Sequence, residues 1–449
     1  MDDQHNILER LYSQELIINI PQNDLIIATE NKIKQIKSYS NNINIIAICE
    51  ENPLEFTSAL LASIITQSCV FLLNPHWQEK ELVQVTKIIT PEIIFDSQNK
   101  LKSLNWLQYH GLKPKFAGIM IPTGGTSGKI KFAIHTWESL TASAESFKRF
   151  WHIENINSFC CLPLYHVSGL MQIVRSFYSK GKIVITSYQD IKKATQINYI
   201  YDDFFISLVP TQLKFILENQ SQWLKHFQTI LVGGSATSET LKDSCRHQQI
   251  NLALTYGMTE TASGITILKP DDFLAGNNSN GQCLPHAQIL IQKHLSTEKT
   301  GVVAIKSTSL FQGYYPQRKK IKVFITDDIG HQDSQQYLHI IGRNNQKIIT
   351  GGENVYPLEI EQVIFATKLV KDVVVFATKD DYWGEVITAV YTPITNSIKN
   401  EEIKNKIKDK ISGYKIPKLW YNCDKIIYNN QGKIDIKWLE KFVKNGDGR

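Results

Sequence analysis

The stretch Ile121-Pro-Thr-Gly-Gly-Thr-Ser-Gly-Lys-Ile-Lys131 decides how the rest of the sequence is interpreted. An apolar run over 116–121 precedes it and predicts a strand, and Phe132-Ala-Ile134 predicts that the chain is extended again after it. Glycines let successive backbone N–H groups converge on one point, hydroxyls add neutral donors, and lysines add positive charge. The stretch therefore predicts an anion-binding loop with a polyphosphate as its simplest ligand. The alternative is a surface turn with a basic end.

Two other phosphate loops do not fit this spacing. A Walker A loop needs four residues between its glycines and a Ser or Thr after the lysine. Gly124 and Gly128 enclose three residues, and Ile130 follows Lys129. The dinucleotide-binding motif needs spaced glycines that begin a helix, whereas here the glycines are adjacent and a strand-like run follows.

Length and composition are those of a large globular chain. It has 449 residues, which predicts two or more domains, and 42% of them are hydrophobic and 20% charged. The net charge of +6 suits anionic ligands weakly, and no basic run is dense enough to predict nucleic-acid binding. Seven cysteines without a C-x-x-C pair argue against a disulfide framework or a zinc site and favour a reducing compartment.

The sequence predicts neither export nor stable membrane insertion. Its first residues, Met1-Asp-Asp-Gln-His-Asn6, are acidic and polar, unlike a signal peptide. The most apolar window, 59–73, is interrupted by Thr66-Gln-Ser68 and is shorter than the roughly 20 residues of a spanning helix. We expect a cytoplasmic protein, or a protein of the plastid stroma if it is organelle-encoded. A homo-oligomer is compatible with the sequence.

The fold class predicted is α/β, because strand-like and helical runs alternate from residue 43 onward. We expect a large N-terminal α/β layered domain at 1–342, with parallel strand pairs and a β-rich part at about 265–342. A hinge at 343–347 then leads into a small, mobile C-terminal α+β domain at 348–449. Strands are predicted at 43–49, 69–73, 93–95, 159–162, 183–186, 204–209, 229–232, 252–256, 288–292, 302–306, 337–341, 372–377 and 387–391, and helices at 54–66, 137–150, 167–178, 211–220, 238–248, 358–367 and 401–411.

A second candidate motif, Thr255-Tyr-Gly-Met-Thr-Glu-Thr261, follows a predicted strand. Ligands of open α/β sheets bind beyond the carboxyl ends of strands. The aromatic ring could stack on a base, the hydroxyl could bind a phosphate, and the carboxylate could hold Mg²⁺, which takes one or two protein carboxylates with phosphate oxygens. The alternative is a core tyrosine, a capping Thr259 and a solvated Glu260.

Four further features are weak when taken singly. His166 lies between a predicted strand and a predicted helix, where a lone histidine is more often structural than catalytic. Leu231-Val-Gly-Gly-Ser235 fails as a nucleophile elbow because Thr237 stands at the final glycine, but paired glycines would let a flat ring lie against the backbone. Asp328 and Arg343 could clamp a sugar diol, or be surface charges. Lys433, in a polar turn, is by itself a surface residue.

Together and in this order, these motifs resemble the adenylate-forming superfamily of acyl-CoA synthetases, luciferases and peptide-synthetase adenylation domains. Its Thr-Ser-Gly-Thr-Thr-Gly-x-Pro-Lys-Gly loop is similar to 123–132, and its Tyr-Gly-x-Thr-Glu to 256–260. Its Thr-Gly-Asp, its Gly-Arg with Pro-x-Glu-Ile-Glu, and its terminal Gly-Lys are similar to 326–328, 342–361 and 432–433. The chain departs from the usual motifs at Gly124, Ile130, Phe132, Asp327 and Gln346.

The resemblance implies a role for each motif. Glu260 would hold Mg²⁺, Lys433 would bridge the carboxylate and the α-phosphate, and His166 would lie at the acyl pocket. After a rotation about the hinge, Gly351 and Gly352 would line the CoA channel. The implied phosphate-binding residues are Thr123, Gly124, Gly125, Thr126, Ser127, Gly128 and Lys131, and the nucleotide-binding residues are Gly233, Gly234, Ser235, Tyr256 (stacked on adenine), Gly257, Thr259, Asp328 and Arg343.

Within the superfamily, 162–169 and 351–357 look like the o-succinylbenzoate–CoA ligases of menaquinone and phylloquinone synthesis, and the loop at 121–131 looks like their cyanobacterial and plastid members. The resemblance implies a reaction of ATP, CoA and an aromatic carboxylic acid through an acyl-adenylate. The alternatives are another acyl- or aryl-CoA ligase, transfer to a carrier protein, or a nucleotide-binding homologue without catalysis.

Overall fold

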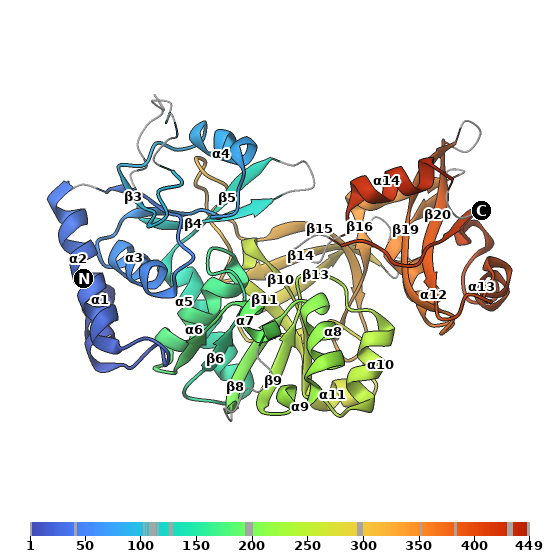
Figure 1. Ribbon diagram of the computed structural model, residues 1–449, viewed down its shortest axis with the longest axis horizontal. Helices are drawn as coiled ribbons and strands as arrows, with labels where there is room; N and C mark the ends of the chain where they lie inside the picture. Colours follow the sequence, from blue (N-terminus) through green and yellow to red (C-terminus); the bar gives the residue numbers. More distant parts are fainter. Residues whose placement is uncertain are drawn as a thin grey trace.

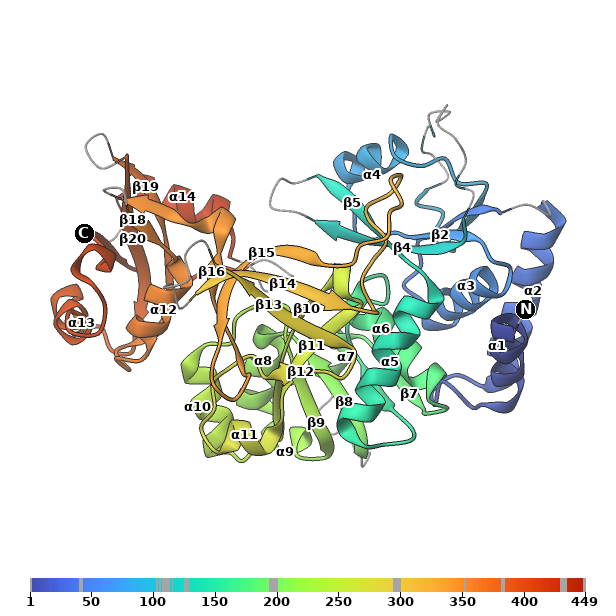
Figure 2. The same cartoon turned by 180° about the vertical axis from the view of Figure 1, so that it is seen from behind.

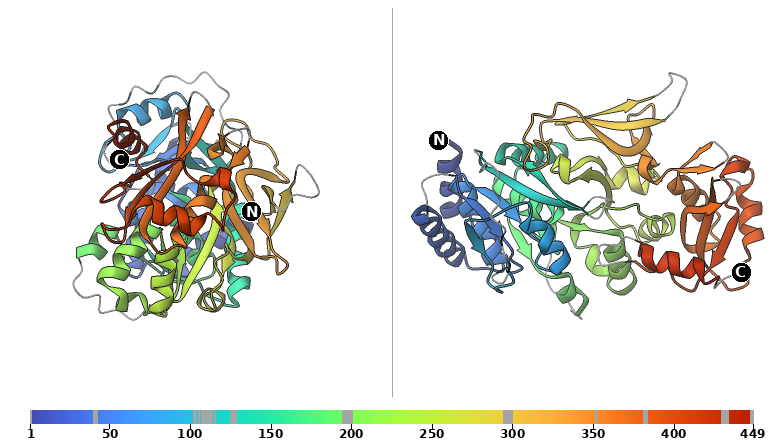
Figure 3. Two further views of the ribbon diagram at one scale, coloured as in Figure 1. Left: turned by 90° about the vertical axis from the view of Figure 1, so that its right-hand side faces the viewer. Right: turned by 90° about the horizontal axis from the view of Figure 1, so that it is seen from above.

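The computed structural model describes residues 2–39, 43–101, 104, 106, 114, 116–124, 129–193, 201–293, 300–350, 353–380, 384–428 and 434–446. The molecule is elongated, with the N-terminal helices at one end of its long axis and the C-terminal part at the other (Figure 1). The view from above shows the same three-part arrangement, in which a β-rich part lies over the middle of the molecule (Figure 3).

The helices and strands have the following bounds. The helices are α1 (Asp2–Ser13), α2 (Gln22–Tyr39), α3 (Pro53–Ile65), α4 (Glu79–Thr86), α5 (Trp137–Trp151), α6 (Val167–Tyr178), α7 (Tyr188–Lys193), α8 (Pro210–Asn219), α9 (Ser221–Leu224), α10 (Glu239–His247), α11 (Pro270–Leu274), α12 (Pro357–Phe365), α13 (Asn400–Ile407) and α14 (Ile436–Lys444), with 3-10 turns η1 (Thr259–Thr261), η2 (Asn344–Gln346) and η3 (Gly413–Lys415). The strands are β1 (Ile45–Ile48), β2 (Cys69–Leu72), β3 (Ile93–Phe95), β4 (Gly118–Gly124), β5 (Ile130–His135), β6 (Asn157–Cys160), β7 (Ile183–Ile185), β8 (Tyr201–Leu208), β9 (Phe227–Val232), β10 (Leu252–Met258), β11 (Ser263–Leu268), β12 (Gln282–Cys283), β13 (Ala287–Gln292), β14 (Gly301–Ser307), β15 (Phe324–Gln332), β16 (Leu338–Arg343), β17 (Ile348–Thr350), β18 (Glu353–Val355), β19 (Val370–Asp380), β20 (Gly384–Pro393) and β21 (Leu419–Asn422).

The first sheet has the order β3-β1-β2-β4-β5. Its inner strands are parallel and fully buried, as their continuous apolar runs predict, whereas β4 and β5 are antiparallel. Gly124 pairs with Ile130 at the end of this hairpin. The stretch at 121–131 therefore connects two strands, as its sequence predicts, and does not lead into a helix.

The second sheet has seven strands in the order β12-β11-β10-β9-β8-β6-β7, and the five strands from β7 to β10 are parallel. Helix α6 is buried on nearly all sides, and its side chains share one apolar cluster with α3 and with strands of the first sheet. The prediction of an α/β fold with parallel pairs is confirmed, with the α/β part divided into two sheets that share this layer of helices.

The third sheet, β13-β14-β15-β16, is antiparallel and lies behind the second sheet in Figure 1 and in front of it in Figure 2. Strands β13, β14 and β16 match predicted strands, but β15 was not predicted. Its sequence includes Thr326-Asp-Asp328, and its burial does not alternate regularly, so the pattern of a half-buried strand is lost where the acidic residues stand.

The C-terminal part is built on the sheet β18-β17-β20-β19, to which β21 adds beside β20. Helices α12 and α13 share the apolar cluster on one face of this sheet, and α14 belongs to a second cluster with Tyr421 and Ile426. The expected α+β composition of this part is confirmed.

All seven cysteines are free thiols. Five are buried, and burial raises the pKa of Cys49, Cys69, Cys160 and Cys245 to about 12 and that of Cys161 further still. Burial also raises the pKa of the half-buried Cys283 and Cys423.

None of the helices in the described ranges is long and apolar enough to cross a membrane.

Candidate active site

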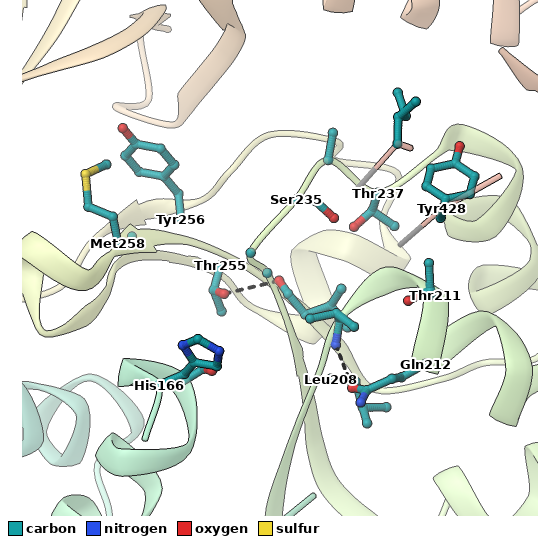
Figure 4. Close-up of a pocket in the computed structure, with 18 of the residues that line it drawn as sticks. His166, Leu208, Thr211, Gln212, Ser235, Thr237, Thr255, Tyr256, Met258 and Tyr428 are labelled. Carbon is teal, nitrogen blue, oxygen red and sulfur yellow. Dashed lines mark hydrogen bonds between the residues drawn. The ribbon is translucent and has the colours of Figure 1, made fainter. Parts of the chain in front are cut away.

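A cleft of about 3760 Å³ lies where the carboxyl ends of β8, β9 and β10 meet the third sheet and the C-terminal part. Figure 4 shows His166, Thr255 and Tyr256 around one side of it, with Ser235 and Tyr428 on the other. Tyr428 comes from the C-terminal part, where its hydroxyl donates to both carboxylate oxygens of Asp372 at 2.9 and 2.8 Å. The cleft is therefore formed jointly by the second sheet, the third sheet and the C-terminal part.

The strands flanking the predicted anion-binding loop reach this cleft. Thr123 and Lys131 are paired across β4 and β5, and both line the cleft. The Nζ of Lys131 lies 5.2 Å from the ring centroid of Tyr314, a cation–π distance. Gly124, the last residue of β4, pairs with Ile130. The loop residues Gly125, Thr126, Ser127 and Gly128 lie outside the described residues.

Tyr256, Asp328 and Arg343 form one hydrogen-bonded group. The Tyr256 hydroxyl donates to Asp328 Oδ2 at 2.6 Å, and Arg343 Nε donates to Asp328 Oδ1 at 2.9 Å. The two charged residues meet because Asp328 and Arg343 are partners in the β15–β16 register. Burial, followed by the Asp328 charge, raises the pKa of Tyr256 well above its usual value. Each oxygen of the Asp328 carboxylate can accept a further hydrogen bond, so Asp328 can also bind the two hydroxyls of a diol.

The glycines at the end of β9 bring the backbone close to β10. A Cβ on Gly233 would lie 2.3 Å from Thr255 Oγ1, and Gly234 has a φ of +85°, where glycine is favoured. The Thr255 hydroxyl donates to Val232 O at 3.1 Å (Figure 4). A Cβ added at Gly257 would lie 2.1 Å from Ser263 O, so a side chain does not fit there either. Glycine is therefore needed for the close packing of these strands, and Gly233, Gly234, Ser235 and Gly257 all line the cleft.

Glu260 is 8% exposed and follows β10 in the 3-10 turn η1. Its Oε1 accepts a hydrogen bond from the Tyr314 hydroxyl at 2.6 Å, while Oε2 makes no hydrogen bond to any residue in the described ranges. Burial, followed by the charge of Glu260, raises the pKa of Tyr314. No group of three or more acidic, His or Cys side chains that could hold a metal occurs in the part of the chain described. One buried carboxylate suits Mg²⁺ that is bound mainly through phosphate oxygens.

His135 holds the turn that carries Glu260. It is fully buried, its Nε2 donates to Thr259 O at 2.8 Å, and its Nδ1 lies 3.0 Å from Ser139 Oγ. Burial lowers the pKa of His135 to about 4, so its imidazole is neutral at pH 7. Sequence reasoning missed both His135 and Tyr314, because neither belongs to a motif with recognisable spacing.

His166 is the N-cap residue of α6 and lines the cleft next to Tyr165, whose ring centroid lies 4.7 Å from that of His166. Its placement between a strand and a helix agrees with the sequence prediction. The start of α6 is packed tightly, since a Cβ on Gly169 would lie 2.2 Å from Pro163 O.

Arg175 is a cleft residue that sequence reasoning also missed. It is 5% exposed, its guanidinium carbon lies 4.4 Å from the Phe147 ring centroid, and its Nη2 lies 3.4 Å from Ser263 Oγ. Burial lowers its pKa to about 10. Its Nε has no hydrogen-bond partner, and it forms no ion pair with any described carboxylate. The available signal was that Arg175 is the single charged residue of α6.

Lys433, Gly351 and Gly352 lie outside the described residues. The site residues that the structure describes, from Thr123 to Arg343, all lie on or beside the cleft.

Two family models match the chain: the AMP-binding enzyme domain at 111–315 and the AMP-binding enzyme C-terminal domain at 359–433. The chain belongs to the AMP-binding enzyme family. A 2-succinylbenzoate–CoA ligase of Lactococcus lactis is 28% identical over 96% of this chain and 98% of the relative. The enzyme of the same name from Listeria monocytogenes is 32% identical over 71% of this chain and 68% of the relative.

Solved structures agree with this fold. An o-succinylbenzoate CoA synthetase of Bacillus subtilis, in complex with an acyl-adenylate intermediate, has a TM-score of 0.79 at 22% identity and covers 97% of both chains. ATP-bound MatB of Rhodopseudomonas palustris has the same TM-score at 20% identity, covering 98% of this chain and 99% of that chain.

Proposed function

We propose that this chain is an ATP-dependent acid–CoA ligase that converts 2-succinylbenzoate, ATP and CoA into 2-succinylbenzoyl-CoA, AMP and diphosphate, a step of menaquinone or phylloquinone synthesis. Relatives with this activity in their names match nearly the whole chain or about 70% of it. The cleft is lined by the nucleotide-binding candidates and also by the buried cation Arg175, which suits an anionic substrate beside a nucleotide.

The nucleotide would lie along the ends of β9, β10 and β15. The surface at Gly233, Gly234 and Ser235 suits the adenine ring. Asp328 would accept from the ribose hydroxyls, with its carboxylate already oriented by Tyr256 and Arg343. Because Tyr256 is committed to Asp328, its ring can border adenine while its hydroxyl supports the ribose site.

The phosphates would extend toward β4 and β5. Thr123, the glycines from Gly124 to Gly128, and the hydroxyls of Thr126 and Ser127 would donate to phosphate oxygens, and Lys131 would add charge. Gly257 and Thr259 would border the α-phosphate.

Glu260 would hold Mg²⁺ through Oε2, the oxygen that faces no described donor. The ion would neutralise negative charge on the phosphates as diphosphate leaves. Tyr314 and His135 keep the carboxylate and its turn in place before any ligand binds.

Arg175 is the observation that supports this acid substrate. 2-Succinylbenzoate has two carboxylates, and the one that does not react stays anionic at neutral pH. A buried guanidinium that faces the cleft without an acidic partner among the described residues is matched by that second carboxylate. Benzoate and fatty acids have only the reacting carboxylate and would leave Arg175 unpaired.

The reaction would proceed in two steps. A carboxylate oxygen of the acid attacks the α-phosphorus of ATP, and the bond to diphosphate breaks. The CoA thiol then attacks the acyl carbon and AMP leaves. His166 would border the reacting carboxylate, and Lys433 would stabilise charge in the first step only.

The second step would use a rotation of the C-terminal part, 348–449, about the hinge at 343–347. In the described structure η2 occupies 344–346 between β16 and β17. Gly351 and Gly352 would then border the CoA channel.

The test is thioester formation from ATP, Mg²⁺, CoA and 2-succinylbenzoate, run beside benzoate, cinnamate and medium-chain fatty acids. We expect turnover of 2-succinylbenzoate with release of AMP and little turnover of the monoacids. If only another acid is turned over, the ligase mechanism still holds, but 2-succinylbenzoate is not the substrate. Absence of turnover with every acid, despite ATP binding, would reject the ligase.

A further inference from the structure

Tyr314 stands on a segment between β14 and β15 that is fixed to β5 by its backbone. Gln312 N donates to Ile134 O at 2.7 Å, and Ile134 N donates to Gly313 O at 2.9 Å. Tyr315 N donates to Phe132 O at 2.9 Å, and Tyr314 itself forms a bridge with Ala133. The segment therefore lies along β5 as an added strand, and Tyr314 is held in register with the hairpin that carries the anion-binding loop.

The same segment also contacts the turn that carries Glu260, and so does His135. Phe311 N donates to Glu260 O at 2.9 Å, and His135 Nε2 donates to Thr259 O at 2.8 Å. Both backbone carbonyls next to the carboxylate are thus fixed by groups from β5 and its added strand. The backbone at Glu260 has little freedom, so the orientation of its side chain depends on the contact at the carboxylate.

That contact is made by Tyr314, whose hydroxyl donates to Oε1 at 2.6 Å while its ring receives Lys131 Nζ at 5.2 Å. A hydrogen bond to a carboxylate is short and strong and restricts the three side-chain torsions of a glutamate. It also leaves Oε2 as the oxygen available to a cation. One side chain thus touches both the proposed Mg²⁺ ligand and the lysine of the proposed phosphate site.

We propose that Tyr314 is a positioning residue that orients Glu260 toward Mg²⁺ on the nucleotide phosphates and sets its spacing from Lys131. This rests on the proposed function, in which Glu260 holds the metal. Tyr314 touches neither substrate nor metal in this role. Loss of the Tyr314 hydroxyl should therefore reduce the gain in nucleotide affinity that Mg²⁺ provides. The affinity for the nucleotide without Mg²⁺ should change less.

The test is calorimetric titration of ATP into Tyr314→Phe with and without Mg²⁺, which needs no turnover. Phe keeps the ring beside Lys131 and removes only the donor to Glu260. We expect the factor by which Mg²⁺ strengthens ATP binding to fall about tenfold, with metal-free ATP binding changed less than twofold. The matched control is Tyr12→Phe, because Tyr12 donates to Glu30 at the same 2.6 Å between the N-terminal helices, remote from the cleft. Tyr12→Phe should titrate as the wild type does.

A double variant separates orientation from general damage. If Tyr314 acts through Glu260, then Glu260→Gln with Tyr314→Phe should bind Mg²⁺-ATP no more weakly than Glu260→Gln alone. Additive losses, or an unchanged Mg²⁺ effect in Tyr314→Phe, would overturn the proposal. If Glu260→Gln binds Mg²⁺-ATP like the wild type, Glu260 is not the metal ligand and the proposal for Tyr314 fails, while the thioester assay still judges the proposed function separately.

Discussion

Arg175 lies between the Phe147 ring, Ser263 and the cleft. Its guanidinium contacts an aromatic face and makes one long hydrogen bond, but no described carboxylate balances its charge. A buried charge without a partner is costly, and such groups concentrate at binding sites. An anionic substrate group would supply the missing partner.

We expect Arg175→Met to raise the KM for 2-succinylbenzoate by about tenfold to a hundredfold, because a hydrogen bond to a charged group contributes roughly 1.5–3 kcal/mol. The KM for ATP should stay within twofold. Arg149→Met is the control, since Arg149 on α5 is exposed and pairs with Glu145 at the surface. Equal losses for monoacids and for the diacid would show that Arg175 does not select the second carboxylate.

The buried His135 makes the free energy of unfolding depend on pH. Its pKa of about 4 in the folded chain lies below the usual 6.5, so the unfolded chain binds a proton at a pH where the folded chain does not. Its contribution to stability is fully present above pH 6.5 and is lost as pH falls toward 4. The full difference corresponds to roughly 3 kcal/mol, at about 1.36 kcal/mol per pKa unit. His286 shifts in the same direction, also to about 4, mainly through burial.

In urea unfolding, the wild type should therefore lose more stability between pH 7.5 and pH 5 than His135→Gln, by about 2 kcal/mol. The control His247→Gln removes an exposed histidine at the end of α10 and should follow the wild type. Parallel pH dependence in wild type and His135→Gln would contradict the neutral buried imidazole.

The sequence predicts much of the site but little of its support. It predicts that Asp328 and Arg343 act together, and the β15–β16 register does bring them into contact at 2.9 Å, while their role at ribose stays a prediction. His135, Tyr314 and Arg175 were missed because each reaches the site through a contact distant in sequence, to Thr259, Glu260 and Ser263 respectively. Only folding brings Tyr314 to Glu260, 54 positions away.

Helix α6 couples packing to the site, because it begins directly after His166 and carries Arg175. We expect Gly169→Ala to lower the free energy of unfolding by about 1–3 kcal/mol, since the added methyl would overlap Pro163 O and force α6 to shift. Gly413→Ala is the control, as nothing lies within 4 Å of a Cβ there. Urea unfolding of both variants checks this, and equal midpoints would show that α6 tolerates the methyl.

Elements with simple periodicity were predicted closely, and those with polar strands were not. Predicted α6 and β3 have the observed bounds. Strand β15 was missed because Asp327 and Asp328 interrupt its apolar pattern. The sequence also could not show that α6 is buried on nearly all sides, because its buried Gln172 and Arg175 give it the pattern of a helix with one exposed face.

At the scale of the molecule, the proposed two-step reaction assigns the C-terminal part to both steps. We expect Lys433→Ala to slow acyl-adenylate formation by a hundredfold or more, the size of effect typical when a transition-state charge loses its stabilising donor. Thioester formation from preformed acyl-adenylate and CoA should stay near the wild-type rate. Pyrophosphate exchange and thioester assays separate the two steps, with Lys425→Ala as an exposed-lysine control. Equal slowing of both steps would contradict the proposal that Lys433 acts in the first step only.

The state of the cysteines has a practical consequence for observing the proposed rotation of the C-terminal part. Thiol labels react with thiolates, and the raised pKa values of all seven cysteines keep the natural thiols protonated at neutral pH. A pair of cysteines introduced on the surface, one beside α10 and one on α13, should therefore take up fluorophores selectively without removal of the native residues. Energy transfer between the two dyes would then follow the distance between the second sheet's helices and the C-terminal part through a catalytic cycle.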